Sequence, residues 1–187
     1  MTNRIGLLFG SFNPIHIGHL ILAEHFATRT DLAEVWLVVT PHNPFKAAVD
    51  LRPETQRLHL VQLAIAGNPR LRAEDVEFGL PRPSYTIATL DALRQRHPTH
   101  DFVLLMGSDN LPSLPRWEQS ARLLAEVDIY VYPRPGTPIP DLNSFPRVKV
   151  MEAPLLDISA TYIRESLRIG RSIRYLVPTT VEAELVK

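Results

Sequence analysis

The stretch RIGLLFGSFNPIHIGHL (residues 4–20) passes from one hydrophobic pattern to another, and this change indicates the fold. Residues 4–10 form an apolar run that ends at Gly10, which is typical of a buried strand. After a turn at Asn13 and Pro14, apolar residues recur at the spacing of one helix face: Leu20, Ala23, Phe26 and Ala27. We therefore predict a strand followed by a helix at the start of the chain.

The rest of the chain repeats this alternation of short apolar runs and helix-period segments. We predict further strands at 34–41, 101–107, 128–133 and 147–153, and helices beginning near 53 and at 84–96, 116–126, 160–169 and 179–186. Strands that are apolar on both faces and alternate with helices indicate a parallel sheet covered on both sides. The predicted fold is α/β, a Rossmann-like doubly wound parallel sheet with helices on both faces. We expect a single domain over 1–187, with a C-terminal helical segment (about 159–187) packed on it.

The composition narrows the choice of partners and compartment. The 187 residues include 20 Lys and Arg and 20 Asp and Glu, so the formal net charge is zero. A protein that grips nucleic acid mainly by its phosphates carries a basic excess, so we expect no nucleic-acid partner. The chain has no cysteine, which excludes disulfides and thiolate metal sites. It shows neither a signal-peptide pattern nor a membrane-length apolar run, so we expect a cytoplasmic protein without a membrane partner.

Two histidines, His16 and His19, stand where the first strand passes into the first helix. Doubly wound sheets bind ligands beyond the carboxyl ends of their strands, and the first N–H groups of a helix favour anions there. Imidazoles at this point can donate to phosphate oxygens and stabilise charge during phosphoryl or nucleotidyl transfer. The alternatives are packed structural histidines and a zinc site, and the absence of cysteines and of suitably spaced carboxylates argues against zinc.

The segment GSFNPIHIGH (10–19) resembles the G-x-F-x-P-x-H-x-G-H signature of the nucleotidyltransferase superfamily related to class I aminoacyl-tRNA synthetases. It matches neither the dinucleotide-binding nor the P-loop glycine motif. The resemblance implies that His16 and His19 contact the phosphates of ATP, with His19 supporting the transition state. It also implies that Gly10, Ser11 and Phe12 line the crevice that binds ATP.

The late segment ISATYIR (158–164) is similar to the I-S-S-T-x-x-R element of the same superfamily. From the residues alone, Ser159 is well placed as the N-cap of a helix. The resemblance implies that Ser159, Thr161 and Arg164 hold the ATP phosphates from the side opposite the histidines. Ala160 replaces the usual second serine and removes one hydroxyl contact.

Four more segments resemble bacterial nicotinate mononucleotide adenylyltransferases: PHNPFK (41–46), PSYTIATL (83–90), GSDNLPSLPRWEQ (107–119) and YPRPG (132–136). The segment YLVP (175–178) matches the end of that family and is expected to be structural. For ATP, the resemblance implies contacts with Gly107 and Asp109. For the acceptor, it implies that Lys46 and Arg134 contact the phosphate. It also implies that the backbone N–H of Thr86, the residue after Tyr85, binds the nicotinate carboxylate, with Tyr85 part of the same site. Trp117 is expected to stack on the pyridine ring.

The activity implied is transfer of the adenylyl group from ATP to nicotinate mononucleotide, giving deamido-NAD and pyrophosphate. The magnesium ion is expected to arrive on the ATP phosphates, and we assign it no protein ligand. Nicotinamide mononucleotide as the main acceptor and a sister enzyme, phosphopantetheine adenylyltransferase, remain alternatives, although the latter usually has threonine in place of the first histidine. A non-catalytic nucleotide-binding regulator is a further alternative, against which His16, His19, Lys46 and Arg164 together argue. The sequence leaves the oligomeric state open, including a homo-oligomer.

Overall fold

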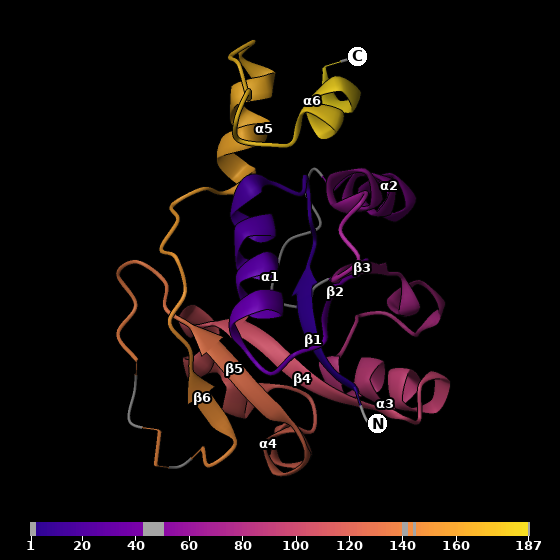
Figure 1. Ribbon diagram of the computed structural model, residues 1–187, viewed down its shortest axis with the longest axis vertical. Coiled ribbons are helices and arrows are strands. Elements are labelled where there is room, and N and C mark those ends of the chain that lie inside the picture. The colour runs from indigo at the N-terminus through magenta and orange to yellow at the C-terminus, as the bar shows by residue number, and fades with distance from the viewer. Residues whose placement is uncertain (1–2, 43–50, 140–141, 144, 187) are drawn as a thin grey trace.

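A computed structural model describes residues 3–42, 51–139, 142–143 and 145–186 of the chain. Its centre is a six-stranded parallel sheet in the order β3-β2-β1-β4-β5-β6 (Figure 1), which confirms the predicted fold class. The strands are β1 (Asn3–Gly10), β2 (Glu34–Val39), β3 (Leu71–Glu74), β4 (His100–Gly107), β5 (Asp128–Tyr132) and β6 (Val148–Val150). The chain builds outward from β1 through β2 to β3, and then from β4 to β6 on the other side. The direction therefore reverses between β1 and β4, where doubly wound sheets open a ligand crevice.

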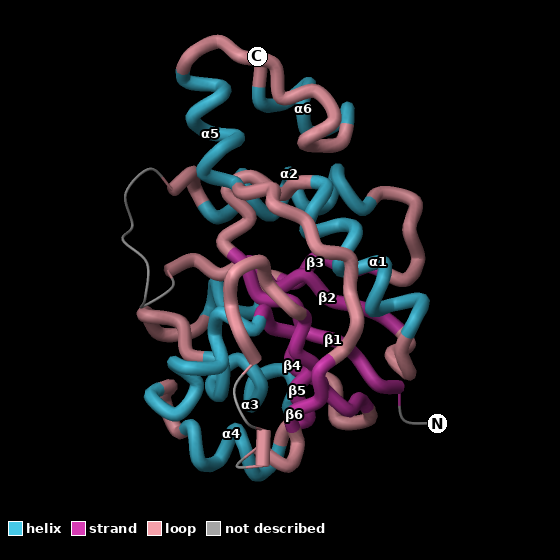
Figure 2. Tube along the Cα trace, turned by 90° about the vertical axis from the view of Figure 1, so that its left-hand side faces the viewer, coloured by secondary structure: helices cyan, strands magenta, loops and turns pink. Residues whose placement is uncertain are grey.

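Helices cover both faces of this sheet (Figure 2). The α-helices are α1 (Ile17–Arg29), α2 (Glu54–Ile65), α3 (Thr86–Arg96), α4 (Ser120–Glu126), α5 (Ala160–Arg168) and α6 (Thr179–Leu185), and two 3-10 helices span Val76–Gly79 and Ser108–Arg116. Helices α1 and α2 pack on one face together with side chains of α5 and α6, whereas α3 and α4 pack on the other. The sheet is thus buried between two helical layers.

The alternation of side chains along β1 produces two separate cores. Leu7 pairs in register with Trp36 of β2 and Leu104 of β4, and all three side chains face α3 and α4. Leu8, the next residue, faces the opposite way, toward the core under α1 and α2. A central parallel strand buried on both faces needs apolar residues at every position, which explains the continuous apolar run.

One expectation from the sequence was wrong in detail, and one strand was not predicted. The helix expected at 116–126 begins only at Ser120, because residues 108–116 form a 3-10 helix that contains Pro112 and Pro115. Strand β3 was not predicted, because its sequence LRAE has two buried residues and no apolar run. It lies at the edge of the sheet, where a strand needs fewer apolar residues.

The C-terminal helices are anchored to the layer formed by α1 and α2. Ile163 of α5 and Val181 of α6 are fully buried in the core under that layer. The carbonyl of Leu176, in the YLVP segment, accepts a hydrogen bond from the N–H of Ile17 at 2.9 Å. The YLVP segment therefore contacts the start of α1, in keeping with the structural role expected for it.

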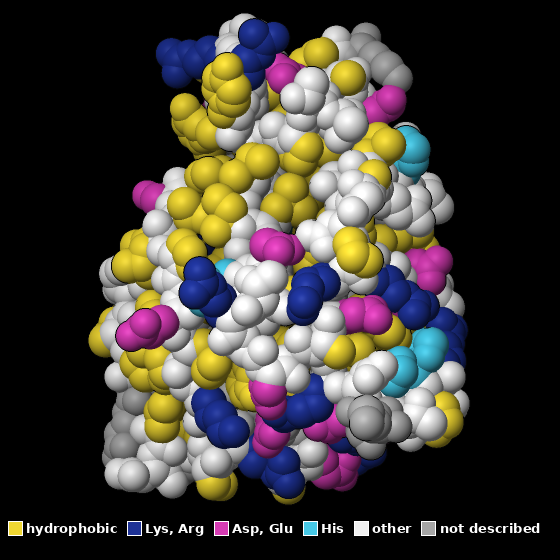
Figure 3. Space-filling model, viewed as in Figure 1, with side chains coloured by type: hydrophobic (Ala, Val, Ile, Leu, Met, Phe, Trp, Pro, Cys, Tyr) yellow, Lys and Arg dark blue, Asp and Glu magenta, His cyan; other side chains and the backbone are white. Residues whose placement is uncertain are grey.

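The face of the molecule shown in Figure 3 carries both acidic and basic side chains. Acidic and basic side chains lie next to one another over the lower part of the face shown in Figure 3, as the zero net charge leads one to expect. Within the described ranges, every helix is too short or too polar to cross a bilayer.

Candidate functional site

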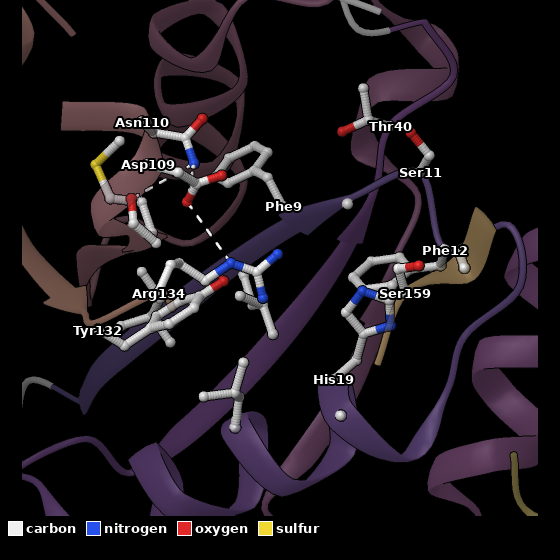
Figure 4. Close-up of a pocket in the computed structure, with 18 of the residues that line it drawn as sticks. Phe9, Ser11, Phe12, His19, Thr40, Asp109, Asn110, Tyr132, Arg134 and Ser159 are labelled. Atoms are coloured by element: carbon white, nitrogen blue, oxygen red, sulfur yellow. Dashed lines mark hydrogen bonds and ion pairs between the residues drawn. The ribbon is translucent and has the colours of Figure 1, made fainter. Parts of the chain in front are cut away.

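One cavity of about 940 Å³ lies at the carboxyl ends of the strands, on both sides of the switch point between β1 and β4. It brings together every predicted site residue that the structure describes: Gly10, Ser11, Phe12, His16, His19, Tyr85, Thr86, Gly107, Asp109, Trp117, Arg134, Ser159, Thr161 and Arg164. Lys46 lies outside the described residues. Figure 4 shows His19, Phe12 and Ser159 on one side of the end of β1, and Asp109 and Arg134 on the other.

The loop after β1 fixes the ring of His19 through Phe12. The phenyl ring of Phe12 is 2% exposed and meets the imidazole of His19 edge to face, with ring centroids 5.0 Å apart. The backbone of Phe12 has φ of +45°, in the left-handed region that bulky residues rarely adopt. A Cβ atom on Gly10 would lie 2.8 Å from two carbon atoms of that ring, so glycine is required there. Phe12 therefore borders the cavity mainly as a support for His19.

His16 and His19 form a stacked pair at the start of α1. Their ring centroids are 3.6 Å apart and their planes are 23° from parallel. His16 is the N-cap residue of α1, is 5% exposed, and its Nδ1 has no hydrogen-bond partner among the described residues. Burial, with a smaller contribution from the charge of Arg134, lowers the pKa of His16 to about 4. His16 is consequently neutral at physiological pH and donates through one ring nitrogen only.

The start of α1 is less open to anions than the sequence led us to expect. The N–H of Ile17 donates to the carbonyl of Leu176 at 2.9 Å, and the N–H of His19 donates to the carbonyl of His16 at 3.0 Å. The chain itself thus satisfies two of the first donors of this helix, one through the C-terminal segment that folds back over its end and one through the N-cap carbonyl of His16. The side chains, more than the helix N-terminus, are left to bind phosphate here.

Helix α5 closes the cavity from the opposite side. Ser159 is its N-cap, as predicted, and Ser159 Oγ accepts a hydrogen bond from the N–H of Tyr162 at 3.2 Å. Arg164 Nη1 donates to the carbonyl of Asn13 at 2.9 Å, and its Nη2 lies 3.4 Å from Thr161 Oγ1. Arg164 therefore links α5 to the loop after β1 while it borders the cavity, a second contact that the sequence did not indicate.

The ends of β4 and β5 supply an acidic and a basic group. Arg134 Nε lies 3.8 Å from Asp109 Oδ1 (Figure 4), and the N–H of Arg134 donates to Ser108 Oγ at 2.9 Å. A Cβ atom on Gly107 would lie 2.3 Å from Asp109 Oδ1, so only glycine allows this carboxylate to fold back over the strand end. Both charged groups are partly exposed, so a ligand can reach either of them.

The remaining side of the cavity is formed by the start of α3 and by Trp117. Helix α3 begins at Thr86, directly after Tyr85, whose side chain is 38% exposed. The positive end of a helix dipole therefore borders the cavity at Thr86. The indole of Trp117 is partly buried, and its Nε1 donates to Ser113 Oγ at 3.1 Å, which holds the ring at the cavity wall.

Comparison with known proteins identifies the family. The cytidylyltransferase-like family model matches residues 7–166. The probable nicotinate-nucleotide adenylyltransferase of Bacteroides fragilis is 50% identical over 184 residues, which cover 98% of this chain and 92% of the relative. That of Cytophaga hutchinsonii is 50% identical over 179 residues, covering 96% and 93%. The chain belongs to the nicotinate-nucleotide adenylyltransferase family.

A solved structure shares the fold of this family member. The nicotinic acid mononucleotide adenylyltransferase of Plasmodium falciparum, complexed with NaAD, superposes with a TM-score of 0.79. It is 21% identical and the match covers 96% of this chain and 93% of that one. At this identity the likeness concerns the fold, and it agrees with the sheet order described above.

Two buried charged residues next to the adenylyltransferase cavity were not predicted. Arg57 of α2 is 1% exposed, and it lies one helical turn before Val61, so its spacing already placed it on the inward face. Glu77 is 1% exposed and borders the cavity, and Thr89 Oγ1 donates to its Oε1 at 2.7 Å. Burial raises the pKa of Glu77, although the hydroxyls of Thr89, Ser84 and Thr40 lower it in part. Glu77 lies in a segment without a hydrophobic pattern, so no sequence signal pointed to it.

The described residues of this adenylyltransferase contain no group of three or more His, Asp or Glu side chains arranged to hold a metal ion. Asp109 is one of three carboxylates in the cavity lining, with Glu77 and Glu118, and its neighbour is the cation Arg134. One carboxylate with a cationic neighbour does not make a complete octahedral magnesium site, but it is suited to bind a water of an ion carried by a nucleotide.

Proposed function

We propose that this member of the nicotinate-nucleotide adenylyltransferase family transfers the adenylyl group of ATP to nicotinate mononucleotide. The 5′-phosphate oxygen of the acceptor forms a bond to the α-phosphorus, and the bond from that phosphorus to the bridging oxygen of the β-phosphate breaks. The products are deamido-NAD and pyrophosphate. The attacking phosphate is already ionised, so the reaction needs no general base.

The enzyme's part in such a reaction is to align two anions and to stabilise negative charge as it spreads in the transition state. His19 and His16 come from one side of the cavity, and Ser159, Thr161 and Arg164 come from the other. Neutral His16 donates one hydrogen bond without adding charge, whereas Arg164 adds a permanent positive charge. This arrangement supports binding of the ATP phosphates between the start of α1 and α5.

Magnesium enters this proposal as part of the substrate, bound to the phosphates of ATP. It would neutralise part of their charge and favour departure of pyrophosphate. Asp109 is assigned to the waters of the ion, since its carboxylate is partly exposed and a single carboxylate suits water-mediated contact.

For the acceptor, we assign the wall formed by Tyr85, Thr86 and Trp117. The positive end of α3 favours a carboxylate over an uncharged amide. This preference selects nicotinate over nicotinamide, and the indole of Trp117 offers a flat surface for the pyridine ring. Arg134, at the end of β5, is assigned to the acceptor phosphate.

The observation that carries the proposal is the meeting of both sets of groups in one cavity. The phosphate-binding candidates come from segments near both ends of the sequence, and the acceptor candidates come from the middle. A site for a mononucleotide beside a site for ATP is what adenylyl transfer requires. The names of the relatives at 50% identity support the same activity.

The test is pyrophosphate release by the purified protein with ATP and magnesium. Nicotinate mononucleotide, nicotinamide mononucleotide and phosphopantetheine are supplied in parallel. We expect release with nicotinate mononucleotide to exceed release with the other two by at least ~10-fold, because a charge at a helix N-terminus distinguishes acid from amide.

The matched controls are His19→Ala and His59→Ala. His59 is exposed on α2, so its loss is expected to leave the rate unchanged, whereas loss of His19 is expected to abolish most of it. Faster release with nicotinamide mononucleotide or phosphopantetheine would reject the proposed acceptor. Absence of release with all three, while ATP still binds, would indicate a regulator in place of an enzyme.

A further inference from the structure

Arg57 is a buried cation, and every hydrogen bond that the structure describes for its side chain goes to a backbone carbonyl. Its Nε donates to the carbonyl of Arg52 at 3.0 Å, and its Nη1 and Nη2 donate to the carbonyls of Thr40 and Pro41 at 2.9 and 3.3 Å. Its Nη1 also donates to the carbonyl of Ser11. One side chain thus holds the loop after β1, the two residues 40–41 that follow β2, and the segment before α2.

Two of the residues held in this way border the cavity. Ser11 and Thr40 line it directly, at the carboxyl ends of β1 and β2. The N–H of Thr40 also donates to the carbonyl of Gly10 at 2.9 Å, which ties the two loops together. The guanidinium therefore lies behind the part of the cavity wall formed by Gly10, Ser11 and Thr40.

The charge of Arg57 has no carboxylate partner in the described part of the chain. None of the ion pairs found there includes Arg57. Glu54, one turn earlier in α2, is paired with Arg82 at 2.7 Å. Burial lowers the pKa of Arg57 and Glu54 raises it, but an arginine side chain remains charged at neutral pH. A buried charge that is held mainly by backbone carbonyls, as Arg57 is in the described part of the chain, is costly, so a strong reason is needed to keep it.

We propose that Arg57 is a positioning residue for the phosphate site, and that its buried charge attracts the substrate phosphates from behind the loop wall. The planar guanidinium of Arg57 sets the directions of the carbonyls of Ser11 and Thr40, so the other groups of these two residues face the cavity. The charge acts through a protein interior, where it is screened less than a surface charge. Binding of a polyanion then places negative charge near this buried cation.

The inference rests on the proposed function only in taking phosphates as the ligand. The proposal predicts that the planar shape of the Arg57 side chain and its positive charge affect different kinetic constants. Arg57→Lys keeps the charge but loses the fork, so we expect KM for ATP within about 3-fold of the wild type and a lower kcat. Arg57→Gln keeps a hydrogen-bond donor but loses the charge, so we expect KM for ATP to rise by roughly 10-fold.

A second readout does not depend on the acceptor or on catalysis. Inorganic tripolyphosphate is titrated while the thermal unfolding midpoint is measured. We expect the wild type and Arg57→Lys to be stabilised by the anion, and Arg57→Gln to need roughly 10-fold more of it for the same shift. Arg70→Gln is the matched control, because Arg70 also donates to a backbone carbonyl (Ala27, 3.0 Å) but is exposed and lies outside the cavity lining.

If Arg57→Gln does not fold, Glu54→Gln tests the same charge. Removing this carboxylate leaves Arg57 intact and makes its surroundings more positive, so KM for ATP should fall by about 2-fold. Equal losses in the Lys and Gln variants, or an unchanged tripolyphosphate response in Arg57→Gln, would overturn the proposed role of the charge. An unchanged or raised KM in Glu54→Gln would overturn it as well. Wild-type release with nicotinate mononucleotide tests the proposed function separately.

Discussion

The imidazole rings of His16 and His19 stack with their centroids 3.6 Å apart, a distance at which two imidazolium ions would repel strongly. Burial and the charge of Arg134 lower the pKa of His16 to about 4, so His16 stays neutral where the enzyme works. The pair therefore presents stacked rings without two positive charges. This relationship has a consequence for the pH dependence of stability.

We predict that His16 makes the protein less stable in acid. The unfolded chain binds a proton on this residue near pH 6.5, whereas the folded chain resists it until about pH 4. The free energy of unfolding therefore falls by about 3 kcal/mol as the pH drops from 6.5 to 4. Chemical denaturation over this range should show a larger loss in the wild type than in His16→Gln, which keeps the losses from other groups with lowered pKa values, such as Asp31, Asp91 and His97. Parallel curves for the two proteins would contradict the assignment.

We predict that Gly10→Ala impairs catalysis through His19. The added methyl group would lie 2.8 Å from the ring of Phe12, and that ring holds His19 edge to face. A displacement of about 1 Å in a catalytic group lowers kcat by up to ~100-fold. Steady-state kinetics should show a fall in kcat of at least ~10-fold. Gly79→Ala is the control, since a Cβ there meets nothing within 4 Å. A Gly10→Ala enzyme with normal kcat would show that Phe12 does not position His19.

Most of the fold was predictable because a central parallel strand must be apolar on both faces. The runs at β1, β2, β4 and β5 carry that signal, and the sheet order confirms the class inferred from it. The edge strand β3 and the 3-10 helix at 108–116 were missed, since their positions depend on contacts distant in sequence and on Pro112 and Pro115.

The site was predictable where a motif is contiguous, and not where a residue acts from behind the surface. GSFNPIHIGH and ISATYIR were matched as strings, and the structure brings both to one cavity. Arg57 and Glu77 were missed because their importance lies in what surrounds them, which tertiary structure alone creates. The same holds for Leu176, whose carbonyl satisfies the first donor of α1.

We predict that Glu77→Gln makes stability less dependent on pH. Burial raises the pKa of Glu77 in the folded state, so the folded form holds its proton more tightly than the unfolded chain. This contribution to stability is complete below the unfolded pKa and is lost as the pH rises through the folded one. The neutral amide should therefore raise the free energy of unfolding relative to the wild type at pH 8 more than at pH 5.

Guanidinium denaturation at the two pH values measures this difference. Glu152→Gln is the control, because Glu152 is exposed and should show no such difference. If Glu77→Gln is no more favourable at pH 8 than at pH 5, Glu77 is ionised in the folded protein. Oε1 of glutamine still accepts the 2.7 Å hydrogen bond from Thr89, which keeps the comparison close to isosteric.

We predict that the acceptor wall depends on the indole of Trp117 for its affinity. Trp117→Ala removes the indole that borders the cavity, and an aromatic contact contributes about 1 kcal/mol beyond its area. We expect KM for nicotinate mononucleotide to rise by roughly 10-fold while KM for ATP stays within about 2-fold. Trp117→Phe keeps an aromatic face and should recover most of the loss. Ser113→Ala removes only the partner of Nε1, 3.1 Å away, and should have a smaller effect. An unchanged KM for nicotinate mononucleotide in Trp117→Ala would mean that the pyridine ring binds elsewhere in the cavity.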